Sequence, residues 1–377
     1  MQSRITPSRP WRRLFALHAL ILVALLWFPG GTRAGTDDSW TSMFHFNGFG
    51  TLGEVHSSDD RANYTDNAYQ PKGPGFDGRW SATPDSKLGA QVTVNFTDQL
   101  SAVVQFVSQY QYNGTYTPYL EWGNVKYQIT PDFSVRAGRI TLPTFMSSDS
   151  LNVGYTLPYV RIPIEIFGQL PVTHSDGVDT SYRFQVGAVT STVQAFVGNY
   201  DSKVPGNIVY DIRGLRGIVD TVEYGAATLH VSYQELHYSY GPFIVNDTQK
   251  LLGVGMSYDP GKWFVLGEWI RAPDQQEGLF YGWYAFGGYR VGKFTPYLGY
   301  ARTYMTTVGS LGIPPIINQN TASLGMRWDF AKNIDLKLQL DHTKLNGGLN
   351  TYFVNQQPNF DATGTLNILS LTVDFVF

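Results

Sequence analysis

Apolar and polar residues alternate with a period of two along most of the chain. In the last segment the apolar positions are Leu369, Leu371, Val373, Phe375 and Phe377, and between them lie Ser370, Thr372, Asp374 and one apolar exception, Val376. A period of two places successive side chains on opposite faces of an extended backbone. Each such segment is therefore predicted to be a β-strand whose two faces meet different environments.

The same pattern predicts sixteen strands between residue 43 and residue 377. Their expected ranges are 43–54, 86–96, 100–112, 119–129, 133–140, 179–190, 193–200, 215–224, 227–238, 250–259, 263–272, 279–291, 294–304, 321–330, 334–345 and 366–377. The predicted links after even-numbered strands are tight, for example Thr130-Pro131-Asp132, Ser191-Thr192 and Gly225-Ala226. The links after odd-numbered strands are long and polar. Short turns on one side and long loops on the other are typical of a transmembrane β-barrel, with the turns in the periplasm.

Alternation alone would also suit a soluble β-sandwich, so composition is needed to separate the two. Aromatic residues make up 15% of the chain and charged residues 15%, against roughly 25% charge in soluble domains. Tyr and Trp recur near the predicted strand ends, as they do at membrane interfaces. The fold class we expect is all-β, a transmembrane antiparallel β-barrel of about sixteen strands.

The N-terminal residues have the pattern of a secretory signal peptide. Arg4, Arg9, Arg12 and Arg13 precede an apolar run, Leu14–Phe28, which is shorter than the roughly 20 residues of a membrane-spanning helix. Small residues then surround Ala34, the expected cleavage site. We therefore expect residues 1–34 to be a signal peptide and residues 35–377 to form the barrel.

Charge and cysteine content narrow the partners. Removing the five arginines that precede residue 35 would change the formal net charge from −3 to −8. Binding to phosphate backbones requires a basic face, so no nucleic-acid partner is expected. The chain contains no Cys, which excludes disulfides and zinc–thiolate sites. No cofactor or metal is expected.

Four features together resemble the Gram-negative porin superfamily of sixteen-stranded trimeric barrels. They are a first strand rich in Phe and Gly (44–50), sixteen segments, a longest loop after the fifth strand, and Phe377 at the end of an alternating segment. The resemblance implies a homotrimer in the outer membrane of a Gram-negative bacterium, in contact with lipid and lipopolysaccharide. It further implies that the third extracellular loop folds into the pore and narrows it, and that Phe377 takes part in recognition for barrel assembly.

That long third loop is predicted at Thr141–Val178, where alternation is absent. It contains many apolar residues, among them Phe145, Tyr159 and Ile166, so it is not composed like a disordered segment. An external loop that packs on neighbouring loops remains the alternative to a constriction loop.

Charged residues define the candidate pore lining. The loop contributes Asp149, Glu165 and Asp176, opposed within it only by Arg161 and His174. Since a lipid-facing cation at the membrane midplane is unfavourable, alternation is expected to turn basic strand residues inward. The expected basic wall comprises Lys126, Arg136, Arg139, Arg183, Arg216, Arg290 and Arg327, with Lys87, Lys337 and Arg302 placed inward by the same rule. An acidic loop opposite a basic wall would create a transverse field in the pore. The alternative is scattered charge, because acidic residues such as Asp335, Asp341 and Asp374 also have inward parity.

Three further patterns are weaker. Gly48-x-Gly50-x-x-Gly53 matches a dinucleotide fingerprint but lies inside an alternating strand with no helix expected after it. His174-Ser175-Asp176 contains the residue types of a catalytic triad, although sequence neighbours seldom meet in that geometry. His56-Ser57-Ser58-Asp59-Asp60 could bind a divalent ion that bridges lipopolysaccharide, whereas a solvated loop is the simpler reading.

The sequence therefore favours a general diffusion porin, which lets small hydrophilic solutes and ions cross passively through a charged, water-filled pore and is not an enzyme. The alternative is a substrate-selective channel with a solute site formed by aromatic residues such as Tyr155, Tyr159 and Trp122.

Overall fold

The computed structural model describes residues 41–168, 172–273, 278–307, 317–348 and 350–377. The predicted signal peptide, residues 1–34, lies outside the described residues. None of the described helices has both the length and the apolar character that a membrane-spanning helix needs.

The described residues form one antiparallel sheet of sixteen long strands and one two-residue strand, β2 (Trp80–Ser81). The long strands are β1 (Phe44–Ser57), β3 (Lys87–Asn95), β4 (Leu100–Gln109), β5 (Tyr119–Thr130), β6 (Phe133–Thr141), β7 (His174–Val186), β8 (Val189–Val204), β9 (Ile208–Tyr224), β10 (Ala227–Tyr240), β11 (Ile244–Tyr258), β12 (Trp263–Pro273), β13 (Gly278–Tyr289), β14 (Phe294–Thr307), β15 (Ile317–Ala331), β16 (Ile334–Leu345) and β17 (Thr365–Val376). The sixteen predicted strands are confirmed.

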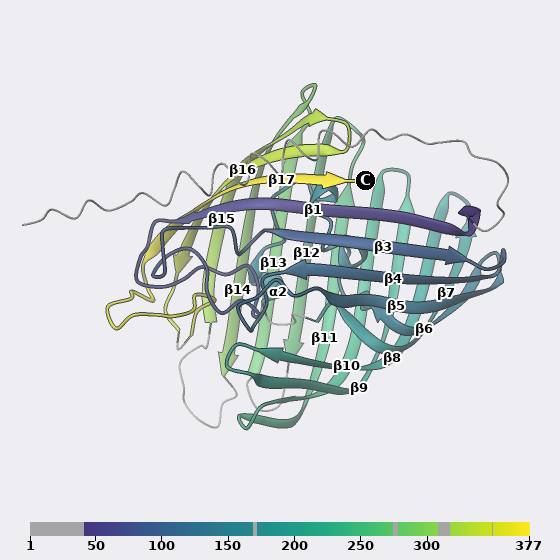
Figure 1. Cartoon of the computed structure of the whole chain (residues 1–377), viewed down its shortest axis with the longest axis horizontal. Helices are drawn as coiled ribbons and strands as arrows, with labels where there is room; N and C mark the ends of the chain where they lie inside the picture. Colours follow the sequence, from purple (N-terminus) through teal and green to yellow (C-terminus); the bar gives the residue numbers. More distant parts are fainter. Residues whose placement is uncertain (1–40, 169–171, 274–277, 308–316, 349) are drawn as a thin grey trace, which may run out of the picture. The chain divides into compact units, whose positions relative to one another are not determined.

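The sheet closes on itself because its first and last strands pair. β1 pairs with β3 on one side and with β17 on the other, from Phe49 opposite Val376 to Ser57 opposite Ile368. Figure 1 shows the purple β1 running beside the yellow β17 although the two are at opposite ends of the described chain. The fold is therefore a closed antiparallel β-barrel, as the alternation predicts.

Alternation sorts each strand into an exposed and a buried face. On β16, Leu338 and Leu340 are 46% and 43% exposed, whereas Lys337, which directly precedes Leu338, is 0% exposed. On β17, Leu371 is exposed and Thr372 is buried. The apolar residues thus lie on the exposed face of the sheet and many polar residues lie on the buried face, the reverse of the usual arrangement in a soluble domain.

Glycine and aromatic residues pair across neighbouring strands. The ring of Phe377 covers Gly48, where an added β-carbon would lie 2.2 Å from the ring, and Phe375 covers Gly50 in the same way. Phe49 covers Gly89 on the next strand. These contacts explain the glycines of β1, because the rings occupy the space that side chains would need. The apparent dinucleotide fingerprint is therefore part of the barrel seam.

Two predicted connections differ from the structure. The turn between β7 and β8 is Gly187-Ala188 and not Ser191-Thr192, which lie within β8; Val186 pairs with Val189, and Gly187 has a φ of 61°. A glycine in the left-handed region is what a two-residue hairpin turn requires. The links after β8 and β10 were expected to be long, yet both strands continue to Val204 and Tyr240 and end in short turns. β-branched and aromatic residues extend these hairpins.

Candidate functional site

The connection between β6 and β7 is long and rich in apolar residues. β7 begins at His174, so this connection covers residues 142–173, within the predicted range Thr141–Val178. It contains two 3₁₀ turns, η2 (Ser148–Ser150) and η3 (Gly154–Thr156), and one helical turn, α2 (Ile164–Phe167). Below we call it the 142–173 segment.

Apolar side chains of this segment are buried against the barrel wall. Tyr159 is 1% exposed and stacks on Phe286 of β13 with 4.2 Å between ring centroids. Within the segment, Phe145 and Phe167 pack at 4.3 Å. These contacts identify the segment as an ordered part of the core, because burying large rings contributes more than isolated loop hydrogen bonds.

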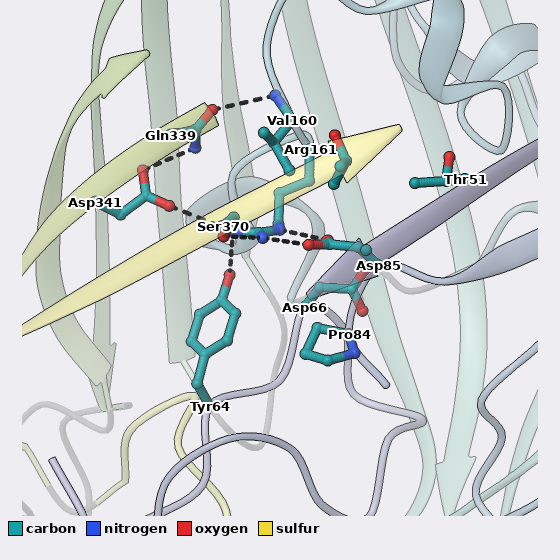
Figure 2. A network of polar contacts seen from close by, with 12 residues as sticks. Thr51, Tyr64, Asp66, Pro84, Asp85, Val160, Arg161, Gln339, Asp341 and Ser370 are labelled. Carbon is teal, nitrogen blue, oxygen red and sulfur yellow. Dashed lines mark hydrogen bonds and ion pairs between the residues drawn. The ribbon is translucent and has the colours of Figure 1, made fainter. Parts of the chain in front are cut away.

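Arg161 is the centre of a buried polar network (Figure 2). Its Nε and Nη2 donate to the two carboxylate oxygens of Asp85 at 2.7 and 2.6 Å. Its remaining N–H groups donate to Asp341 at 3.3 Å, to the Tyr64 hydroxyl at 3.1 Å and to the Ser370 hydroxyl at 2.5 Å. The five bonds match the five N–H donors of a guanidinium. Arg161 therefore joins the 142–173 segment to the 58–86 connection and to strands β16 and β17.

Burial and charge act in opposite directions on this arginine. Burial disfavours the guanidinium charge, but the carboxylates of Asp85 and Asp341 raise the Arg161 pKa well above its ordinary value. Two carboxylates, Asp85 and Asp341, face the single guanidinium of Arg161, so the ionised cluster has an excess of negative charge. Next to Arg161, the backbone N–H of Val160 donates to Gln339 Oε1 at 3.1 Å, and Gln339 in turn donates to Asp341 at 2.8 Å (Figure 2).

Two strand cations hold the backbone of the segment. Lys337 Nζ donates to the Gly154 carbonyl at 2.6 Å and lies 3.0 Å from Asp374. Arg327 Nη1 donates to the carbonyls of Tyr155 and Leu157 at 2.7 and 3.0 Å. The backbone carbonyls of a buried connection need hydrogen-bond partners, and here strand side chains supply them in place of secondary structure. A β-carbon at Gly154 would lie 2.1 Å from Asp374 Oδ1, so this close approach depends on glycine.

The two ends of the segment contact other parts of the sheet. Near its start, the Met146 N–H donates to Glu268 of β12 at 3.0 Å, and Ser232 of β10 donates to the Thr144 carbonyl at 2.8 Å. Near its end, Glu165 accepts hydrogen bonds from Thr321 and Gln319 of β15. Burial raises the pKa of Glu165, and these two neutral donors oppose the rise. The segment thus bonds to the buried faces of β10, β12 and β15–β17.

A cavity of about 520 Å³ remains beside the segment. The segment borders it with Leu151, Asn152, Gly154, Leu157, Val160, Arg161, Ile162 and Phe167, and the rest of the lining includes Asp66, Tyr69, Lys87, Gln109, Tyr112, Tyr119, Arg139, His174, Tyr200 and Lys203. One wall is therefore mostly apolar and the other carries tyrosine hydroxyls, amides and charges. The hydroxyls of Tyr69 and Tyr200 are 2.5 Å apart.

Asp66 is the acidic group of this lining whose ionisation is most altered. It belongs to the connection between β1 and β3, outside the long strands of the barrel. Burial raises its pKa to about 7, while Lys87 opposes the rise. Its charge therefore changes near neutral pH.

Several predicted pore residues form ion pairs along the ladder between β6 and β7. Arg136 binds Asp179 through Nε and Nη2, at 2.5 Å for the shortest contact, and Arg139 binds Asp176 at 2.8 Å. Lys126 lies opposite Arg136 in the β5–β6 register. Asp176 is thus a strand residue that neutralises a predicted basic wall residue directly.

The other predicted residues are dispersed. Arg183 is exposed near the Gly187 turn, Arg216 pairs with Glu235 at 3.2 Å on the exposed face of β9, and Arg290 pairs with Asp259 at 2.6 Å beyond the end of β13. Asp149 is exposed in η2. Three of the charged residues expected in the pore join the 142–173 segment to the barrel wall. Glu165 accepts from neutral donors of β15, and Arg327 and Lys337 donate to backbone carbonyls of the segment.

Arg302, like Arg216, differs from its expected orientation, which was toward the buried face of the sheet. It is exposed on β14, in the same register row as Trp283, whereas its neighbours Ala301 and Thr303 are buried. The parity rule placed it inward because an outward cation is unfavourable at the membrane midplane, but that cost falls to roughly 0–1 kcal/mol near an interface.

Asp85 and Tyr64 were not recognised from the sequence as site residues. Asp85 lies 76 positions before Arg161 in the chain, in a connection without periodicity. No local pattern predicts that contact, because it depends on where two irregular connections meet. Asp341 and Asp374 did have the parity of the buried face, but their partners were not predictable.

The remaining patterns gain no support as chemical sites. Ser175 points to the opposite face of β7 from His174 and Asp176, since neighbours alternate along a strand. Among the described residues, no group of three or more His, Asp or Glu side chains could hold a metal ion.

Solved structures of outer-membrane porins have a fold similar to that of this barrel. It is similar to Salmonella typhi OmpF in complex with daunomycin (TM-score 0.61, 11% identity, 89% of this chain and 97% of that one). It is also similar to the anion-selective porin from Comamonas acidovorans (0.59, 12%, 89% and 99%) and to the trimer form of OmpT, an outer membrane protein of Vibrio cholerae (0.55, 12%, 89% and 99%). No protein-family model and no curated protein sequence matches the chain. The fold is that of the porins: a closed antiparallel barrel of sixteen long strands.

Proposed function

We propose that the protein is an outer-membrane porin of a Gram-negative bacterium, through which small hydrophilic solutes and ions diffuse passively. The observation that carries the proposal is the 142–173 segment, bonded to the buried, polar face of a closed barrel whose exposed face is apolar. An apolar exterior suits lipid and a polar interior suits water.

In this proposal the 142–173 segment lies in the pore and constricts it. Its anchors lie on β10, β12 and β15–β17, and the cavity of about 520 Å³ lies on its other side. Solutes would pass through that cavity. Arg136 with Asp179, Lys126, Lys87 and Asp66 would set the local field, whereas Glu165 would act as an anchor.

Passage through such a pore needs no covalent step, cofactor or metal, and we propose no enzymatic activity. The trimer that the sequence resemblance implies, and that a structural neighbour is described as forming, is proposed for this chain too. Lipid and lipopolysaccharide would surround the exposed face.

A substrate-selective channel is the second candidate, and the tyrosines of the cavity favour it. Tyr69, Tyr112, Tyr119 and Tyr200 border the cavity. Tyr155 and Tyr159, which the sequence suggested, are instead bound to Arg327 and Phe286. A selective site would make solute flux saturable.

Planar-bilayer recording of the purified protein tests these proposals. We expect conductance steps in groups of three, linear with salt concentration, and a reversal potential in a salt gradient that reports ion preference. Absence of conductance from correctly folded protein would overturn the porin proposal. Block of ion current that saturates with one added solute would favour the selective channel.

A further inference from the structure

The exposed face of the barrel carries a row of polar side chains near the long-loop ends of β14–β16. Arg302 pairs in register with Asn320, and Asn320 with Lys344. Arg302 and Lys344 are exposed. Strands are about 4.8 Å apart, so the backbones of Arg302 and Lys344 are roughly 10 Å apart, with Asn320 on the strand between them.

No acidic residue lies in this row or in the adjacent rows on the same face. The next row contains Tyr300, Ala322, His342 and Asn367, and the row on the other side contains Tyr281, Tyr304, Asn318 and Asn346. Arg302 and Lys344 have no ion pair with any described residue. Two other exposed arginines of the wall are paired: Arg213 with Asp201 and Asp211, and Arg216 with Glu235.

The row lies at a membrane interface and not at the midplane. Phe294 and Trp328 stack at 5.7 Å near the opposite ends of β14 and β15. Arg302 lies eight positions after Phe294, which is about 26 Å along the strand and roughly 20 Å across a membrane at a tilt of 35–45°. The exposed residues between them include Leu298 and Leu324, 67% and 64% exposed. The exposed apolar band of β14 and β15 therefore extends over roughly 20 Å and ends at the row that contains Arg302 and Lys344.

We propose that Arg302, Asn320 and Lys344 bind the phosphorylated head group of a membrane lipid whose acyl chains lie along the apolar band. A guanidinium recognises phosphate through two parallel hydrogen bonds, and a lysine adds a second point charge. Asn320 Oδ1 accepts a hydrogen bond from Asn346 Nδ2 at 2.9 Å, so the amide group of Asn320 can donate to an anion. Cations and acyl-chain surface together match a lipid better than free phosphate.

The inference rests on the proposed membrane location. The test uses the detergent-solubilised folded protein and native mass spectrometry, with bisphosphorylated lipid A and chemically dephosphorylated lipid A as probes. We expect the phosphorylated lipid to bind more tightly by about tenfold, and the double variant Arg302→Gln/Lys344→Gln to lose that difference. The matched control Arg216→Gln, a paired arginine on the same face, should bind as the unmodified protein does.

Equal binding of the two lipids, or full phosphate-dependent binding by the double variant, would overturn the proposal. Competition by millimolar inorganic phosphate equal to that by the lipid would also overturn it, because the site would then recognise a bare anion. A change in oligomeric state of the double variant, measured by light scattering, would instead assign this face to subunit contact. Bilayer conductance of the double variant should equal that of the unmodified protein. If the unmodified protein itself does not conduct, the porin proposal fails, whatever the lipid binding shows.

Discussion

Arg161 shows how one side chain can connect three parts of the chain. Its five donors are satisfied by the 58–86 connection, β16 and β17. Removing one partner from a buried ion pair leaves the other charge uncompensated, at a cost of about 3–5 kcal/mol. Loss of Arg161 therefore weakens the contacts between the 142–173 segment and the barrel wall, whereas the hydrogen bonds between strands are retained.

We therefore expect Arg161→Met to release the segment while the barrel remains folded. Single-channel conductance should rise, on the order of twofold, and become noisier. Arg161→Lys, which keeps the charge but not the planar fork, should lie in between. Arg213→Met, which removes an exposed arginine that also pairs with two aspartates, is the control and should leave conductance unchanged. Identical recordings for both methionine variants would show that Arg161 does not hold the segment in place.

Asp66 gives a prediction for pH. With a pKa raised to about 7, its carboxyl group is neutral at pH 5.5 and ionised at pH 8.5. The cation preference of the pore should increase over this interval, and Asp66→Asn should remove that part of the change. Because salt in the hydrated lumen screens the carboxylate, the shift in reversal potential should be small, on the order of a few millivolts, and larger at low salt. A variant with the same pH profile as the unmodified protein would contradict the role of Asp66.

At the scale of residues, parity was a good guide to orientation and a poor guide to partners. It predicted the buried orientation of Lys337 but not its bond to the Gly154 carbonyl. It failed for Arg216, which pairs with Glu235 on the exposed face, and for Arg302, because the rule treats the exposed face as uniformly apolar.

The 142–173 segment is the element on which the proposed pore depends. Its η2 and η3 turns lie between the anchors at Met146 and Arg161. Removing these turns also removes the Gly154, Tyr155 and Leu157 carbonyls that Lys337 and Arg327 hold, but it leaves Met146 and Arg161 in the chain. We expect deletion of residues 148–157 to widen the pore and to raise both conductance and the size limit for sugars in liposome swelling. Gly154→Val should act similarly by displacing η3 from Asp374, whereas Gly287→Ala, at a glycine with room for a β-carbon, should not. Unchanged conductance after the deletion would place the segment outside the solute path.

Strand elements were predictable because period two persists over many residues. Turn positions were less so: Ser191 and Thr192 have turn-like polarity, but only Gly187 offers a residue suited to a positive φ. The interior of the 142–173 segment was not predictable, since its contacts join residues far apart in the sequence.

For the whole molecule, an even number of long strands places alternate connections at opposite ends of the barrel. We expect epitope tags at Pro131, Ala188 and Gly261 to face the periplasm, and tags at Ser58 and Asn346 to be accessible on intact cells. Labelling is measured before and after permeabilisation, with barrel folding checked by heat-modifiable migration. Surface labelling at Ala188 would contradict the assignment from β7 onward.

One pairing of the barrel has a consequence for how the chain reaches this fold. Consecutive long strands can join as hairpins, but β1 and β17 bring together residues as distant as Phe49 and Val376. Until they meet, the sheet has two open edges, and open edges pair readily with other chains. Closing so long a loop is also slow compared with hairpin formation. The vulnerable state of this protein is therefore a nearly complete, unclosed sheet, and its yield should depend on how dilute, or how well shielded, that state is kept.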